Sequence, residues 1–302
     1  MNKNIRNRIR RAVLLVLVPT TFLLLPFSLR ADSEDAKNTE PASSKPLTDE
    51  LSIVRQMKAL LEPEGPSLRR IDLTVKNRAA YTEGYETVEK IAALAVKKFP
   101  DGKRMLFVML EPEDVKGMAF LLKERNDQTD VMWVYLPAIR RVREIKPIDQ
   151  YESLFGTDFT YADLGFIKLH GHYKLLGEEE HNGVRAYKIQ EKVPQDLVYY
   201  SKIVTWVAAD SMLPVERDFY GPAGDLMKRE LFQDASIVDG EPTALRITMK
   251  DVEQDTRTEL NIREVDYDVH LPDSLFDPKQ LPVVSNHGIW KSCMGLPGKG
   301  KE

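Results

Sequence analysis

The sequence predicts a mostly β protein of the α+β class, built on an antiparallel sheet of about 10 to 12 strands that closes toward a barrel. Three observations support this prediction. Short runs rich in β-branched and aromatic residues recur along the chain, separated by turn residues. Only residues 47–61 have the clear apolar spacing of a long helix. Several strands are apolar on both faces, which indicates that each side of the sheet is covered.

The N-terminus has the features of an export signal. Basic residues precede an apolar stretch from Ala12 to Leu25, and a polar, acidic run follows. This order is typical of a secretory signal peptide, which we predict over residues 1–31 with cleavage after Ala31. We therefore expect the chain in the periplasm; an uncleaved N-terminal anchor is the alternative, because the cleavage site is not a clean A-x-A. Residues 32–46 are polar and are predicted to form a flexible leader.

The predicted helix opens the folded domain, which we expect over residues 47–282. Thr48 or Asp49 can cap the helix, because a short polar side chain there accepts a hydrogen bond from a free backbone N–H. Apolar residues follow at helical spacing until Pro63 and Gly65 end the pattern. The stripe indicates a helix packed on a core, or one lying across the mouth of a sheet.

Strand-like segments then follow in series with short connections. Residues 89–99 are compatible with a helix or a strand, and the hairpin turn that follows at residues 100–103 favours a strand. The sequence "HNG" at residues 181–183 predicts a second hairpin turn. Residues 283–302 are rich in Gly and Lys, and we expect them to form a flexible tail.

The two-faced apolar pattern is clearest in "RMLFVMLEP". Met105, Phe107 and Met109 share one face of this strand, and the three apolar residues between and after them share the other. One helix and the aromatic segment at residues 151–172 are too little to fill the concave side of a large curved sheet. The sequence therefore predicts an internal cavity lined by apolar side chains, with a fully packed core as the alternative. An acyl chain would gain ~0.8 kcal/mol per methylene buried there.

The sequence carries no motif of a known reactive site. It lacks G-x-S-x-G, H-E-x-x-H, a Walker A loop and G-x-G-x-x-G, so we predict no catalytic residue, no cofactor and no enzyme activity. The net charge of −4 gives no basic footprint, which argues against a nucleic-acid partner. Cys293 lies in the predicted tail. His170 and His172 could share a strand face, but two ligands do not make a metal site, and none is predicted.

One enzymatic alternative rests on two carboxylates. Asp158 and Asp163 lie in the aromatic segment and could act as the acid–base pair of an envelope hydrolase. The other interpretation is that both side chains hydrogen-bond to the backbone of their own loop, as Asp often does in turns.

Several motifs in order resemble a known family. "MWVYLPAIRRVREI", "LFGTDFTYADL" and "YKLLGEEEHNGVRAYKIQ", followed by matches at residues 203–232 and 265–281, resemble the outer-membrane lipoprotein-sorting proteins of the LolA-like superfamily. The resemblance covers about residues 47–281. It implies a half-open antiparallel β-barrel, closed by a helix and loop lid around a hydrophobic cavity. In this chain, the "KLHGHY" segment and the tail after Pro282 depart from the family pattern. The resemblance therefore does not identify the cargo or the membrane partner.

The resemblance also implies a function. We expect a carrier that binds lipid or lipoprotein acyl chains and delivers them toward the outer membrane, or to a membrane protein such as an RND-type exporter. The alternative is a sensor or scaffold of the same fold that docks to an envelope membrane protein without moving cargo. Arg141 and Arg143 could meet a lipid headgroup or an acidic partner, or make local salt bridges on a strand surface. The residues expected at the cavity or its mouth are Leu106, Phe107, Met118, Phe120, Trp133, Tyr135, Phe155, Phe159, Tyr161, Leu164 and Trp206.

Overall fold

The structure is a computed structural model of the 302-residue chain. It describes residues 49–62, 64–78, 83–125, 130–165, 167–169, 171–193 and 199–293. Pro46–Glu302 form a compact unit by themselves. The predicted signal peptide and leader lie outside the described residues. Within the described ranges, no helix has the length and apolarity that crossing a bilayer would require.

The predicted helix is present as α1, Glu50–Leu61. It begins where Asp49 accepts a hydrogen bond from the backbone N–H of Leu51 at 3.2 Å, so the N-cap is the aspartate and the helix starts three residues after the expected position. Ile53, Val54 and Met57 form its buried stripe.

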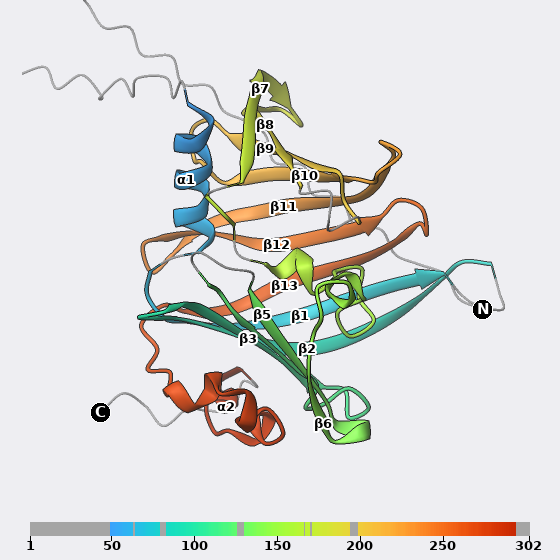
Figure 1. The fold of residues 1–302 in the computed structure, drawn as a ribbon, viewed down its shortest axis with the longest axis vertical. Coiled ribbons are helices and arrows are strands. Elements are labelled where there is room, and N and C mark those ends of the chain that lie inside the picture. Colours follow the sequence, from blue (N-terminus) through green and yellow to red (C-terminus); the bar gives the residue numbers. More distant parts are fainter. Residues whose placement is uncertain are drawn as a thin grey trace, which may run out of the picture. The chain divides into compact units, whose positions relative to one another are not determined.

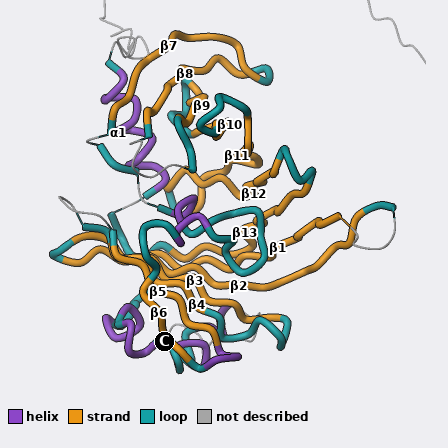
Figure 2. Tube along the Cα trace, turned by 45° about the vertical axis from the view of Figure 1, so that its right-hand side comes forward, coloured by secondary structure: helices purple, strands orange, loops and turns teal. Residues whose placement is uncertain are grey.

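The sheet has thirteen described strands, slightly more than expected, and every neighbouring pair is antiparallel (Figure 1). Strands adjacent in sequence are adjacent in the sheet, except for β6 and β7, and β1 also pairs with β13, the last strand. Figure 2 shows β6 and β7 at opposite ends of the series, so the barrel is open, as predicted. The strands are β1 Ser67–Arg78, β2 Tyr85–Phe99, β3 Gly102–Glu111, β4 Ala119–Lys123, β5 Val131–Leu136, β6 Arg141–Glu144, β7 His172–His181, β8 Val184–Lys192, β9 Lys202–Ala208, β10 Pro214–Tyr220, β11 Leu226–Val238, β12 Glu241–Asp251 and β13 Thr256–Asp266.

The two predicted hairpins are confirmed. The segment that was compatible with a helix or a strand is β2, and it turns into β3 at Gly102. Gly102 has a φ of 128°, and a Cβ at this position would lie only 2.4 Å from the carbonyl oxygen of Glu124. Only glycine fits both conditions. Asn182 and Gly183, with φ of 51° and 78°, make the tight turn between β7 and β8.

The two faces of β3 belong to two separate hydrophobic clusters, as the alternation predicted. Phe107 and Met109 join a cluster that includes Phe155 and Phe159 of the aromatic segment. We call the face that carries this segment the inner face, and the opposite one the outer face. On the outer face, Leu106 and its neighbours pack under a different part of the chain, described next.

Residues 271–290, here called the C-terminal cover, pack on the outer face of β2 to β5. Leu275, Phe276, Val284 and Trp290 are all buried in the outer cluster. The indole N–H of Trp290 donates to the carbonyl of Val284 at 2.6 Å. The prediction that a flexible tail begins at residue 283 was therefore wrong for residues 283–290, because their apolar side chains have a sheet face to cover. Residues 294–302 lie outside the described part.

Helix α1 packs on the inner face at the other half of the sheet. Its apolar stripe contacts Tyr187 and Ile189 of β8 and Val207 of β9. These three residues lie on the same face of the sheet as Ile203 of β9. Ile203 is the cross-strand partner of Phe219 on β10, and both contribute to the inner cluster. The helix and the aromatic segment therefore lie on the same side of one sheet, over different strands (Figure 1).

Candidate binding face

The central element of the inner face is the aromatic loop, which we define as residues 151–165. Phe155, Phe159 and Tyr161 are buried. The ring of Tyr161 lies 5.2 Å from that of Phe120 on β4, and the ring of Phe155 lies 6.4 Å from that of Phe107 on β3. These aromatic contacts fix the loop against the strands of the inner face.

Asp158 ties the loop to β13. Its carboxylate accepts hydrogen bonds from the hydroxyls of Thr256 and Thr258, the latter at 2.6 Å. The ammonium of Lys228 donates to the Asp158 carbonyl at 2.6 Å, and that of Lys90 donates to the Phe155 carbonyl at 2.8 Å. Both lysines are buried side chains of the sheet, so the loop backbone is held by charge-assisted hydrogen bonds from two strands.

Asp163 closes the other end of the loop. It accepts from the backbone N–H of Thr160 at 2.7 Å and from the Tyr200 hydroxyl at 3.0 Å, and it lies 3.4 Å from the Lys228 ammonium. Burial and the neighbouring Asp163 charge raise the pKa of Tyr200. Both aspartates that could have formed a hydrolase pair are thus engaged in holding the loop. This favours the loop-bonding interpretation of Asp158 and Asp163 over a hydrolytic one.

A second aromatic group joins the loop to β9 and β10. Tyr151 stacks on Tyr199 with a ring separation of 4.9 Å, Tyr199 contacts Tyr200 at 4.9 Å, and Tyr200 contacts Phe219 at 5.0 Å. The sequence analysis did not single out these residues. The pair "YY" just before a predicted strand was the available signal.

The residues predicted to line one cavity are divided between the two faces. Leu106, Trp133 and Tyr135 lie on the outer face under the C-terminal cover, and Trp206 lies on the outer face of β9. Successive side chains of a strand point to opposite faces of the sheet, and the prediction combined residues from both faces. The inner set is Phe107, Met118, Phe120, Phe155, Phe159, Tyr161 and Leu164.

Trp206 has a local role in this structure. Its ring stacks on the imidazole of His181 at 4.2 Å, and its indole N–H donates to Glu179 at 2.7 Å. Hydrogen bonding from Trp206 lowers the pKa of the Glu179 carboxyl.

The inner face continues beyond the loop as a partly exposed apolar surface. Ile203, Ile247 and Ile262, on β9, β12 and β13, pack against the inner cluster without being fully buried. None of the three was predicted, because in a single strand each looks like an ordinary alternating residue. They provide the accessible apolar surface on which a ligand could extend the inner cluster.

Charged side chains lie beside this surface. Arg217 of β10 and Glu230 of β11 are direct cross-strand partners, with 3.2 Å between the guanidinium Nε and the carboxylate. Burial raises the pKa of Glu230 to about 7, and the Arg217 charge offsets part of that effect. Burial also raises the pKa of Glu191 on β8, against the same guanidinium. One arginine thus lies beside two carboxyls of the inner face whose pKa values are both raised.

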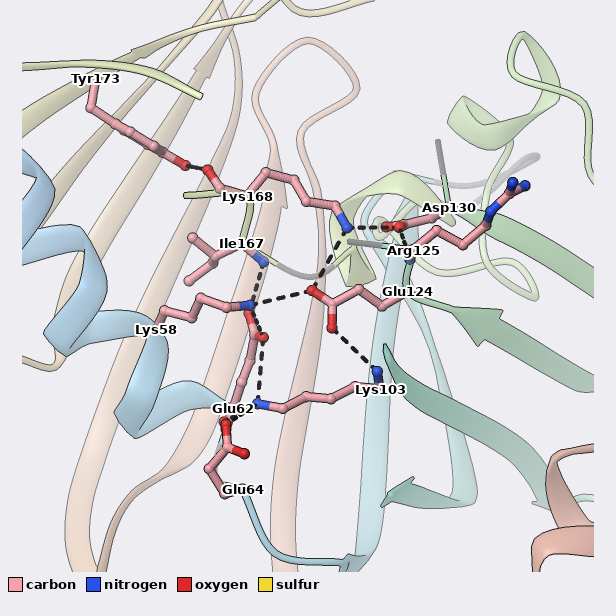
Figure 3. A network of polar contacts seen from close by, with 10 residues as sticks. All are labelled: Lys58, Glu62, Glu64, Lys103, Glu124, Arg125, Asp130, Ile167, Lys168 and Tyr173. Carbon is pink, nitrogen blue, oxygen red and sulfur yellow. Dashed lines mark hydrogen bonds and ion pairs between the residues drawn. The ribbon is translucent and has the colours of Figure 1, made fainter. Parts of the chain in front are cut away.

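A network of ions anchors the end of α1 (Figure 3). Glu62 accepts from the backbone N–H of Ile167 at 2.7 Å and pairs with Lys58, while the Lys103 ammonium donates to the Glu62 carbonyl. Burial raises the pKa of Glu62, and the Lys58 charge offsets part of the rise. Lys58 also lies 3.6 Å from Glu124, which follows β4. The network joins the helix over one half of the sheet to the strands of the other half.

Residue 168 extends this network into the segment after the aromatic loop. The ammonium of Lys168 lies 2.7 Å from Asp130 and 3.7 Å from Glu124 (Figure 3). His170 lies outside the described residues, and His172 is exposed. Among the described residues, no group of three or more potential ligands could hold a metal ion.

The two predicted headgroup arginines lie on β6, an end strand whose side chains are all exposed. Arg143 makes salt bridges with Glu152 at 3.0 Å and Asp149 at 3.4 Å, so it braces the start of the aromatic loop. Arg141 has no ion pair with the described residues. The local salt bridges expected as an alternative thus exist for Arg143.

Comparisons with known proteins agree with the fold. The chain superposes on a candidate outer membrane lipoprotein-sorting protein domain from Vibrio parahaemolyticus with a TM-score of 0.71 and 24% identity, covering 77% of this chain and 98% of that one. For a LolA superfamily protein from Nitrosomonas europaea, the TM-score is 0.58 and the identity 19%, with coverage of 76% and 97%. The LolA-like fold predicted from the sequence is confirmed.

A further structure and a family model complete the comparison. The chain also superposes on a DUF1329 family protein from Desulfovibrio piger with a TM-score of 0.70 and 25% identity. This match covers 79% of this chain and 100% of that one. A family model described as "Uncharacterized protein" matches residues 101–282. The chain belongs to this family. No curated protein sequence matches it.

Proposed function

We propose that this protein is a periplasmic carrier that binds lipid or lipoprotein acyl chains on the inner face of its open sheet. It would deliver them toward the outer membrane or to a membrane protein such as an RND-type exporter. The observation that carries the proposal is the partly exposed apolar surface formed by Ile203, Ile247 and Ile262, beside an aromatic loop and a helix on the same face. The similarity to a candidate lipoprotein-sorting domain supports it.

The energetics favour an acyl chain as the ligand. Each methylene moved from water to an apolar surface gains ~0.8 kcal/mol, so an acyl chain that buries about ten methylenes gains roughly 8 kcal/mol before the cost of association is subtracted. A carrier needs no reactive group, and the two loop aspartates are already engaged in hydrogen bonds. Arg141 is the residue on β6 that is left to meet a headgroup, since Arg143 braces the loop.

The test is binding of a fluorescent fatty acid by the purified protein, with native mass spectrometry of protein taken from its own periplasm. Ile247→Glu places a charge on the inner face and is expected to weaken binding at least tenfold, since it replaces favourable burial by the desolvation of a carboxylate. Ile237→Glu is the matched control, because Ile237 is 65% exposed at the end of β11. Its binding should be unchanged.

Two results would contradict the proposal. One is wild-type protein that carries no extractable lipid and does not bind the fatty acid. The other is equal affinity of the two variants, which would place the ligand elsewhere. Circular dichroism of both variants shows whether the fold is retained.

A further inference from the structure

A pocket of about 500 Å³ lies where the ends of β1 and β2 meet the turn between β12 and β13. Its strand residues Lys76, Lys250 and Arg257 share one face of the sheet, because they are direct cross-strand partners. This is the outer face, since Met249, which precedes Lys250 on β12, belongs to the inner cluster and points to the opposite side of the sheet. The lining residues are Lys76, Tyr85, Thr87, Lys250, Asp251, Val252, Asp255, Thr256 and Arg257.

Cationic side chains cross the sheet here in a row. Lys76 on β1 lies opposite Arg257 on β13, Arg257 lies opposite Lys250 on β12, and Lys250 lies opposite Arg229 on β11. Like charges directly opposite one another destabilise a sheet. Arg229 is compensated by Glu216 and Asp218, but the other three line the pocket. The row has an energetic cost within the protein that an external anion would relieve.

Two of the three pocket cations have no carboxylate partner among the described residues. Neither Lys76 nor Lys250 forms an ion pair there, and Arg257 pairs only with Glu259, at 3.3 Å. Their charges are therefore available to a ligand.

The two acidic residues of the pocket are already engaged. Asp255 accepts from the Tyr85 hydroxyl at 2.5 Å and from Arg78 at 2.8 Å, and the Tyr85 hydrogen bond holds the pKa of this carboxyl below its usual range. Asp251 accepts from the backbone and side-chain amides of Gln254 at 2.8 and 3.1 Å. Asp251 is thus bonded within its own turn, and Asp255 is bonded to the ends of β1 and β2, so neither carboxylate pairs with Lys76 or Lys250.

We propose that this pocket binds a phosphate group, carried by a phospholipid headgroup or by a soluble phosphate ester. Lys76, Lys250 and Arg257 would supply the charge, and Thr87 lies within the same lining. Tyr85 and Val252 are 53% and 47% exposed beside the cations, a combination suited to the boundary between headgroups and acyl chains. The three cations are on the opposite face from the proposed acyl-chain surface, and the site does not depend on the carrier function.

The experiment compares two variants of equal charge. Lys76→Gln/Lys250→Gln removes the unpaired cations of the pocket. Lys174→Gln/Lys279→Gln removes two exposed lysines that also lack ion pairs among the described residues, on β7 and in the C-terminal cover. Wild type and both variants are titrated calorimetrically with sn-glycerol 3-phosphate. They are also sedimented with phosphatidylcholine vesicles that contain or lack phosphatidylglycerol.

We expect the wild type to bind at least one probe, and the pocket variant to bind it at least about tenfold more weakly while the control variant is unchanged. Binding of the ester without the vesicles identifies a soluble ligand, and binding of the vesicles alone identifies a membrane surface. The proposal is overturned if neither probe binds, or if both variants lose affinity equally, since a general charge effect would then explain the result. Fatty-acid binding in the same variants reports on the carrier function separately.

Discussion

The two halves of the sheet are built differently. From β1 to β6, alternate residues of a central strand such as β3 are buried on both faces, beneath the aromatic loop on one side and the C-terminal cover on the other. From β7 to β13, the inner face carries ionisable groups, among them Arg217 and Glu230. The first half gains its stability mainly from packing, although Lys90 and Lys103 are buried there, whereas the second half holds the buried Glu230, whose pKa is raised. A ligand or a change in pH should act on the second half first.

The largest effect should come from the packed half. Phe120 and Phe276 are almost fully buried on opposite sides of it, so replacing either by Ala should lower the free energy of unfolding by about 3 to 5 kcal/mol in urea titrations. Ile139→Ala, at a 60% exposed residue, should change it by less than about 0.5 kcal/mol. A small loss for Phe276→Ala alone would mean that the C-terminal cover is dispensable.

The second effect tests the ion network between the halves. Lys103→Met leaves the Glu62 carbonyl without its donor and removes a cation beside a buried carboxylate, so unfolding should cost about 2 kcal/mol less. Lys116→Met breaks an exposed pair with Glu113 and should cost at most about 0.5 kcal/mol. If both substitutions have the same effect, the network adds nothing to the attachment of α1.

The third effect concerns pH in the charged half. Because burial raises the pKa of Glu230 to about 7, the folded state binds more protons than the unfolded state between pH 4.5 and about 7. The free energy of unfolding should therefore fall as pH rises through this window. Glu230→Gln should make this decrease in the free energy of unfolding smaller by about 1 to 2 kcal/mol. The pH dependence that is left should come from Glu191, whose pKa is also raised. Equal pH profiles for wild type and Glu230→Gln would contradict this, and Glu264→Gln at an exposed residue is the control.

The smallest effect is expected at β6, the part of the packed half without buried side chains. Arg143→Gln loses two exposed salt bridges and should lower stability by about 0.5 kcal/mol or less, and Arg141→Gln should change it less still. Measurements of fatty-acid and vesicle binding by the two variants would show whether each arginine supports the aromatic loop or contacts a lipid headgroup. Loss of vesicle binding in Arg141→Gln alone would assign the contact to that residue.

Much of the fold could be predicted because its signals are local. The cap at Asp49, the turn at Asn182 and the two-faced pattern around Phe107 each depend on a few neighbouring residues. The face to which a residue points relative to the loop depends on strand pairings between distant segments. Leu106 and Trp133 were therefore grouped with inner residues although they lie outside.

The charged inner surface and the C-terminal cover were missed for a related reason. Glu230 alternates with Arg229 and Leu231 as in any half-exposed strand, and its burial arises only when β10 and the loop approach it. Trp290 and Val284 stand in a stretch whose Gly and Lys content is typical of loose tails. Two apolar side chains in such a stretch are too few to predict that it packs on the sheet. In the folded chain they pack there because the outer face of the sheet presents apolar side chains to them.

The open sheet has a consequence for association between molecules. β6 and β7 end the strand order, so each has an edge that could pair with another chain. β6 is only four residues long and presents Arg141, Arg143 and Glu144. β7 has an irregular register near Gly177 and continues with three successive glutamates. Short length, charge and a bulge are the features that keep exposed edges from joining, so the protein can stay open to a ligand without growing into aggregates.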